Sequence, residues 1–117
     1  MYEYKAVIDR WVDGDTVDVD IDLGFDVVLR DQRVRLYGIN TPESRTRDLE
    51  EKKRGLAAKE RVNEMAPVGT RVTLLTHKYD AKGKFGRILG AIVVDDGTVN
   101  DMLIQEGHAT PYYGGKK

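Results

Sequence analysis

Residues 12–23 read Val-Asp-Gly-Asp-Thr-Val-Asp-Val-Asp-Ile-Asp-Leu, a tight-turn dipeptide followed by strict alternation of apolar and acidic side chains. Asp13-Gly14 is typical of a β-hairpin, because both central positions of such a turn tolerate positive φ. Side chains alternate between the two faces of a strand, so Thr16–Leu23 has one apolar face and one acidic face. The acidic face carries Asp18, Asp20 and Asp22. The stretch predicts a hairpin whose second strand is half-buried.

Further strand patterns lie on both sides of this hairpin. Tyr4–Val12 alternates loosely before the turn, and Val27–Ile39 resumes the alternation after Gly24. Thr41-Pro42 ends the third strand, because proline lacks the N–H that a sheet needs and forces its predecessor into an extended conformation. Two later β-rich segments predict the fourth and fifth strands: Arg71–Thr76 and Arg87–Val94. The basic, glycine-containing segment 78–86 between them predicts a loop.

Two segments predict helices. Ala58, Val62 and Met65 recur at helical spacing, in a helix that starts between Leu49 and Leu56. A second helix follows the fifth strand, with Thr98 as its cap, Gly107 as its left-handed stop, and an inner face of Val99, Met102, Leu103 and Ile104. The order of these elements predicts a mainly β fold with two or three helices, a five-stranded OB-fold Greek-key barrel.

The length of 117 residues suits one compact domain, because two independent cores would each be too small. We therefore expect a single domain over residues 1–117, with a short flexible tail from about residue 114. The chain has no cysteine and two histidines, so a disulfide framework and a thiolate zinc site are excluded and any metal is held by oxygen. Without a signal-peptide pattern or a membrane-spanning run, we expect a cytoplasmic monomer with no membrane contact.

Charge is balanced overall but uneven along the chain. A net charge of −1 gives no global positive field, so a polyanion would have to bind locally. The basic run contains Arg30, Arg33, Arg35, Arg45 and Arg47, and the acidic run contains Asp13, Asp15, Asp18, Asp20 and Asp22. This contrast predicts phosphate clamps set against an acidic pocket for a cation.

Three segments, in this order and spacing, resemble staphylococcal nuclease and its thermonuclease-like relatives. They are Val12–Val17 (VDGDTV), Arg35–Glu43 (RLYGINTPE) and Lys84–Arg87 (KFGR), and Val99–Gly107 looks like the family's helix after the last strand. The resemblance implies a calcium-dependent endonuclease that hydrolyses phosphodiester bonds of DNA, RNA or both and leaves 3′-phosphate products.

The resemblance also implies a metal site. Asp15, Asn40 and the backbone carbonyl of Thr41 match the family's calcium ligands, and calcium prefers such hard oxygen donors. Asn40 departs from the family pattern, which has an aspartate there, so one negative charge is lost. The acidic strand face either compensates for that charge or is simply solvated. A turn aspartate that hydrogen-bonds the backbone is the alternative for Asp15 and, more strongly, for Asp13.

Three residues match the family's catalytic groups. Arg35 and Arg87 match the guanidinium pair that holds the scissile phosphate, for which a planar fork of donors is suited. Glu43 matches the carboxylate that acts on the attacking water. Contacts to nucleic acid are implied for Lys84, Tyr112 and Tyr113. The alternative function is a catalytically weakened or silent OB-fold module that binds nucleic acid, which Asn40 favours.

Overall fold

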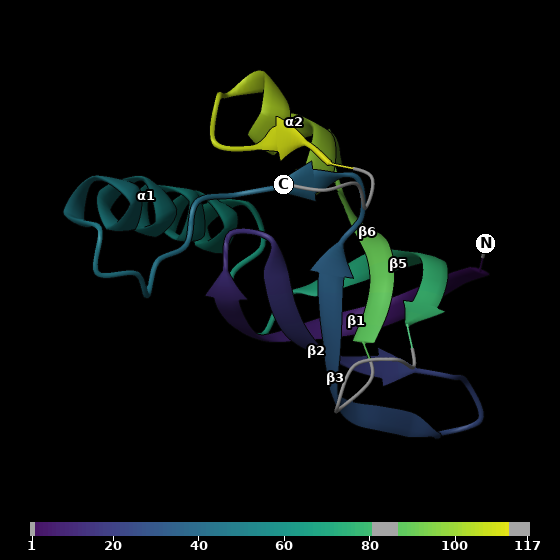
Figure 1. Ribbon diagram of the computed structural model, residues 1–117. Helices are drawn as coiled ribbons and strands as arrows, with labels where there is room; N and C mark the ends of the chain where they lie inside the picture. Colours follow the sequence, from purple (N-terminus) through teal and green to yellow (C-terminus); the bar gives the residue numbers. More distant parts are fainter. Residues whose placement is uncertain (1, 81–86, 113–117) are drawn as a thin grey trace.

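The computed structural model describes residues 2–80 and 87–112, and five of its strands form a closed barrel (Figure 1). These are β1 (Tyr2–Asp13), β2 (Thr16–Asp22), β3 (Val28–Leu36), β5 (Arg71–Asp80) and β6 (Arg87–Val94). They are hydrogen-bonded in the order β3-β2-β1-β5-β6 with antiparallel neighbours. A parallel pairing of β3 with β6 closes the barrel. The OB-fold prediction is confirmed.

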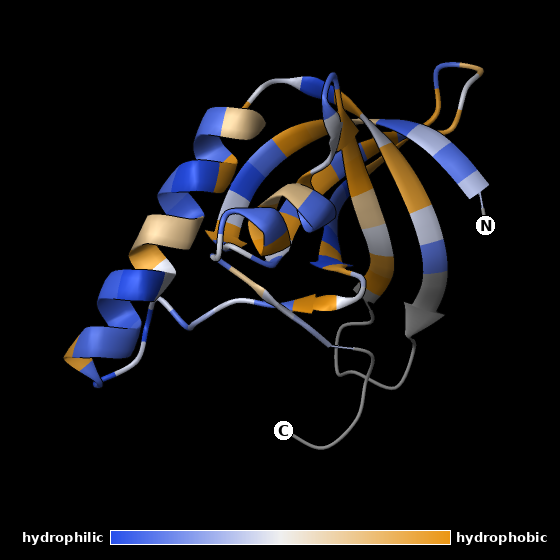
Figure 2. Ribbon diagram, turned by 90° about the horizontal axis from the view of Figure 1, so that it is seen from above, coloured by the Kyte–Doolittle hydropathy of each residue, from blue (hydrophilic) through white to orange (hydrophobic). Residues whose placement is uncertain are grey.

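The apolar side chains that alternate along β2 point into the barrel, as the sequence predicts. Val17, Val19 and Ile21 are at most 2% exposed, and the alternation of apolar and polar positions is visible along the strands in Figure 2. At the barrel's end, the Trp11 ring is buried and its Nε1 donates to the Ala66 carbonyl at 2.9 Å. This bond ties β1 to the chain that leaves the first helix.

The third strand is shorter than predicted. β3 ends at Leu36, and Gly38 adopts a φ of +81°, a left-handed conformation that breaks the extended chain. The next two residues form β4 (Ile39–Asn40), which pairs with β8 (Thr110–Pro111) outside the barrel. The prediction of one strand through Ile39 is therefore wrong, because alternation of side chains does not reveal a change of pairing partner. The break turns the chain toward the candidate site.

The helices lie beside the barrel in Figure 1, and the described residues contain two of them. α1 (Leu49–Met65) begins after Asp48, whose carboxylate accepts from the amides of Glu50 and Glu51. β7 (Gly97–Thr98) pairs with β6 and leads into α2 (Val99–Gln105), which Thr98 caps as predicted. The predicted stop at Gly107 has a φ of +80°.

The inner face of α2 differs from the prediction in one respect. Val99 and Leu103 are fully buried and Met102 and Ile104 are half-buried, as expected for residues that face the barrel. Asn100, which the apolar pattern omits, is buried as well.

The remaining predictions concern length and membrane contact. β5 continues to Asp80, four residues beyond the predicted Thr76, and the rest of the predicted basic loop, residues 81–86, lies outside the described residues. The tail from residue 114 lies outside them too. Within the described residues, neither helix combines the length and the apolar character that a bilayer crossing requires.

Candidate functional site

The turn between β1 and β2 places Asp15 against the segment that follows β3. The Asp15 side chain is 11% exposed, and its Oδ2 accepts from the Thr41 amide at 3.0 Å while its Oδ1 accepts from Thr16 Oγ1 at 3.0 Å. A Cβ at Gly14 would lie 2.9 Å from Ala58 Cβ and 3.1 Å from Thr41 Cγ2. The glycine is needed for this close approach rather than for positive φ. The predicted turn is confirmed, for a different physical reason.

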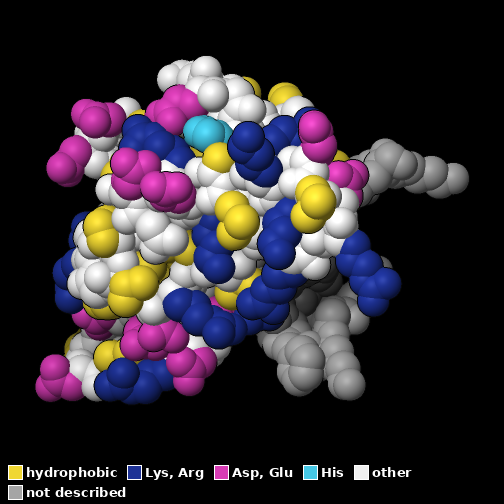
Figure 3. All heavy atoms as spheres, turned by 90° about the vertical axis from the view of Figure 1, so that its left-hand side faces the viewer, with side chains coloured by type: hydrophobic (Ala, Val, Ile, Leu, Met, Phe, Trp, Pro, Cys, Tyr) yellow, Lys and Arg dark blue, Asp and Glu magenta, His cyan; other side chains and the backbone are white. Residues whose placement is uncertain are grey.

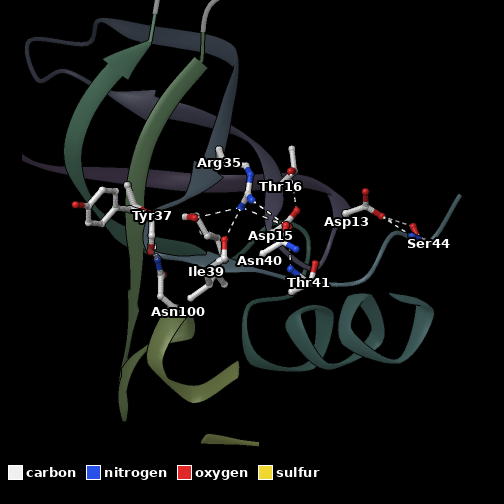
Figure 4. A network of polar contacts seen from close by, with 12 residues as sticks. Asp13, Asp15, Thr16, Arg35, Tyr37, Ile39, Asn40, Thr41, Ser44 and Asn100 are labelled. Atoms are coloured by element: carbon white, nitrogen blue, oxygen red, sulfur yellow. Dashed lines mark hydrogen bonds and ion pairs between the residues drawn. The ribbon is translucent and has the colours of Figure 1, made fainter. Parts of the chain in front are cut away.

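Arg35 reaches the same point from the end of β3 (Figure 4). Its Nη1 lies 3.4 Å from Asp15 Oδ2 and donates to the Ile39 carbonyl at 3.0 Å, and its Nη2 donates to Asn40 Oδ1 at 3.2 Å. The Arg35 side chain is 14% exposed. Three predicted site residues, Asp15, Arg35 and Asn40, are therefore brought together by the turn after β3.

Oxygen atoms at this point fit a hard cation by chemical type. Thr41 Oγ1 is buried and has no hydrogen-bond partner among the described residues, which leaves an oxygen available to a ligand or its water. It belongs to the residue whose amide holds Asp15. Residues 2–80 and 87–112 contain no group of three or more His, Asp or Glu side chains placed to bind a metal. The expected donors bring one negative charge, which fits a weakly held divalent cation.

Glu43 lies on the segment that α1 supports. This side chain is exposed, and it lines a cleft of about 540 Å³ together with Asn40, Glu51, Arg54 and His108. Its carbonyl oxygen is close to the position that a Cβ at Gly55 would occupy, so the helix packs directly on the Glu43 backbone. The cleft gives a substrate access to Glu43 from solvent.

Asp13 does not join the site. Its Oδ1 accepts from both the amide and the hydroxyl of the buried Ser44, which fixes the start of the loop toward α1. The structural role that sequence analysis favoured for Asp13 is what the structure gives. Ser44 carried no signal in the sequence beyond its place in a polar segment.

Of the three residues predicted to contact nucleic acid, one lies within the described part of the chain. Tyr112 lies close to the site, with its amide donating to the Gly38 carbonyl at 2.8 Å and its ring centroid 6.0 Å from Arg35 Cζ. Lys84 and Tyr113 lie outside the described residues. Arg87 begins β6, the strand that pairs with β3, and its side chain is also outside the described part.

The acidic face of β2 is neutralised by arginines. Asp18 accepts from Arg33 Nε at 2.9 Å and from Arg10 Nε at 3.1 Å. Burial raises the pKa of Asp18, but these hydrogen bonds and charges lower it by more, and the net pKa is below its usual range. Asp20 pairs with Arg30, and Asp22 with Arg71. These ion pairs favour the alternative of a solvated strand face over that of compensating negative potential at the metal site.

Basic side chains gather on one face of the molecule (Figure 3). On the face drawn in Figure 3, a band of Lys and Arg side chains crosses the surface between groups of Asp and Glu. On a chain of net charge −1, positive charge is therefore gathered locally on this face (Figure 3).

Comparison with known proteins identifies the family to which this chain is related. The family described as Staphylococcal nuclease homologue matches residues 33–117, more than half of the chain. The chain belongs to the staphylococcal nuclease family. The matched range includes Arg35, Asn40 and Glu43, and the barrel is the fold that the resemblance implies.

Three similar proteins from Bacillus subtilis (strain 168) carry endonuclease names. Endonuclease YhcR is 27% identical over 95% of this chain and 9% of its own length. The SPbeta prophage-derived endonuclease YokF is 33% identical over 92% of this chain and 34% of its own length. Endonuclease YncB is 31% identical over 93% of this chain and 48% of its own length. The chain thus spans about half or less of the relatives it matches.

One residue important to this member of the staphylococcal nuclease family was missed by sequence analysis. Asn100 accepts from the Ile92 amide at 3.3 Å and donates to the carbonyls of Tyr37 at 2.9 Å and Gly90 at 3.2 Å. It fastens the turn after β3, and with it the chain that carries Asn40, to β6 and α2. A polar residue on the apolar face of a helix was the only signal available.

Proposed function

We propose that this chain is a metal-dependent endonuclease that hydrolyses phosphodiester bonds of DNA, RNA or both to 3′-phosphate products. The observation that carries the proposal is the convergence of Asp15, Arg35 and Asn40, with Asn40 and Glu43 lining one cleft, in a member of the staphylococcal nuclease family. The endonuclease names of the three relatives support it.

The proposed cation is calcium, held by Asp15, the Asn40 amide oxygen and the Thr41 carbonyl. Bound there, it would supply Lewis-acid polarisation of the phosphate and charge stabilisation in the transition state. The unbonded Thr41 hydroxyl supports a polar ligand at this point. With Asn40 in place of an aspartate, affinity for the cation is low.

The remaining steps belong to the chain's own side chains. Glu43 accepts a proton from the attacking water, for which its exposed position in the cleft is suitable. Arg35 and Arg87 donate to the equatorial phosphate oxygens, where negative charge develops as the bond to the 5′ oxygen breaks. The 5′ oxygen leaves with a proton from solvent. Lys84, Tyr112 and Tyr113 grip the flanking nucleotides through charge and stacking.

The direct test compares two carboxylates of the same cleft, Glu43 and Glu51. Single-stranded DNA and RNA are incubated with wild type, Glu43→Gln and Glu51→Gln in calcium, in magnesium and in chelator. We expect Glu43→Gln to lower the cleavage rate by about 10²- to 10⁴-fold, the usual contribution of a general base. Glu51→Gln should cleave like wild type, and equal losses in both variants would contradict the role of Glu43.

A second candidate function is a nucleic-acid-binding module without turnover. It is favoured by Asn40 and by the contacts that tie Arg35 to the protein itself. Cleavage by wild type contradicts this function. Binding of single strands in chelator, with no cleavage under any condition and a gain of cleavage in Asn40→Asp, would establish it instead.

A further inference from the structure

Arg35 makes most of its contacts inside the protein. Its guanidinium donates to the carbonyls of Leu36 and Ile39, pairs with Asp15 and bonds to Asn40. This leaves 14% of the side chain exposed. By contrast, Arg33 on the same strand is 45% exposed. A guanidinium with so many internal acceptors has few donors left for an external ligand.

Two of these partners, Asp15 and Asn40, carry oxygens assigned above to the cation. Asp15 Oδ2 lies 3.4 Å from Arg35 Nη1, and Asn40 Oδ1 accepts from Nη2 at 3.2 Å. Asp15 Oδ2 also accepts from the Thr41 amide, so little of its capacity remains. Two positive groups that shared these oxygens would repel each other in a site shielded from water. The guanidinium and a divalent cation therefore require the same place.

We propose that Arg35 competes with the divalent cation for Asp15 and Asn40, so that the free site is blocked by its own arginine. This inference rests on the metal site of the proposed function and adds its regulation. Occupation by a cation requires the guanidinium to leave Asp15 and Asn40. Arg35 thereby sets the cation affinity of the unliganded protein.

Arg33 provides a matched control. It lies two residues away on β3 and forms the same kind of ion pair, with Asp18 at 2.9 Å. Replacing Arg33 or Arg35 by glutamine removes the same charge from the same strand. Only the change at Arg35 frees the oxygens of Asp15 and Asn40. The pair of variants thus separates competition at the site from a general loss of positive charge.

The experiment is calorimetric titration of calcium chloride into wild type, Arg35→Gln and Arg33→Gln, with circular dichroism to verify folding. We expect the calcium dissociation constant to fall by about tenfold or more in Arg35→Gln, because a unit charge in direct contact is removed, and by about twofold or less in Arg33→Gln. Unchanged affinity in Arg35→Gln, or equal tightening in both variants, would overturn the proposal.

A second variant guards against misfolding of Arg35→Gln. Arg35→Lys keeps the charge but lacks the planar fork that bridges Asp15 and Asn40. We expect it to bind calcium a few-fold more tightly than wild type, and an affinity equal to that of wild type would count against competition.

Two outcomes separate this inference from the proposed function. If neither wild type nor any variant binds calcium, the metal site and the competition both fail. If wild type cleaves single-stranded DNA with calcium while Arg35→Gln binds the ion no better, the endonuclease stands and the competition is wrong.

Discussion

The ribbon formed by β2 and β3 has two contrasting ends. At the site end, Asp15 and Arg35 are 11% and 14% exposed, and the turn at Gly14 packs on Thr41 and Ala58. Toward the far end the same kind of pair, Asp20 with Arg30, is 24% and 74% exposed. The tip beyond carries Phe25, which is fully exposed.

The difference shows that residue type alone does not make a site. Both ends pair an aspartate with an arginine of β3: Asp15, in the turn before β2, pairs with Arg35, and Asp20 of β2 pairs with Arg30. The antiparallel register of β2 and β3 brings the acidic run beside the basic run. At the far end water screens the pair, and its contribution to stability is small. At the site end the pair is shielded, and oxygens of Asp15 and Asn40 lie against the Arg35 guanidinium, so removing one partner has a large effect. Four measurements test whether burial causes this difference.

The largest difference is expected between Asp15→Ala and Asp20→Ala. Removing Asp15 leaves Arg35 buried without its anion and should cost about 3 kcal/mol of unfolding free energy, whereas Asp20→Ala should cost about 0.5 kcal/mol. Urea unfolding measures both values. Similar costs at the two positions would mean that the site pair is solvated like the surface pair.

The two turns provide the next comparison. Gly14→Ala places a Cβ 2.9 Å from Ala58 and should cost about 2 kcal/mol through overpacking. At Gly24 nothing lies within 4 Å of such a Cβ, and the φ of +81° alone should cost about 1 kcal/mol. We expect cleavage to fall in Gly14→Ala only, because that change displaces Thr41. A loss of activity in Gly24→Ala would link the far end to the site.

Asp18, between the two ends, predicts a pH dependence. Its folded pKa is lower than the ordinary value of 3.8, so its pairing stabilises the protein above about pH 4 and is lost as the pH falls through the folded pKa. Asp18→Asn should lower the free energy of unfolding by about 1 kcal/mol at pH 7. Below pH 4, the free energy of unfolding of this variant should fall less steeply with pH than that of wild type. Unfolding by urea at pH 7, 4 and 3 checks this. If the stability of Asp18→Asn fell as steeply as that of wild type below pH 4, other carboxyl groups would be responsible for the loss of stability in acid.

The smallest effect is expected at the tip. Phe25 has a φ of +56° and no burial to compensate for that strain. Phe25→Asn should raise the unfolding free energy by about 0.5 kcal/mol, because asparagine tolerates the left-handed region better. The midpoint of thermal unfolding would report it. A decrease would instead show that the phenyl ring makes contacts that stabilise the fold.

Much of the fold could be predicted from local patterns. Alternation at Val17, Val19 and Ile21 identified a half-buried strand, and Thr98 and Gly107 marked the ends of α2. These features depend on neighbours in the sequence, so the sequence contains them. The end of β3 at Leu36 was missed because it depends on Gly38 and on pairing with β8.

The β-rich barrel, the family and the residue types of the candidate site follow from the sequence, because periodicity, turn residues and short motifs are local. Tertiary structure decided which oppositely charged residues meet. Arg33 pairs with Asp18, and Arg30 pairs with Asp20. Asp13 instead accepts a hydrogen bond from Ser44. The tertiary structure also buries Arg35 against Asp15 and Asn40. Register, burial and contacts between separate segments set most of these partners, so the local pattern around each residue does not reveal them.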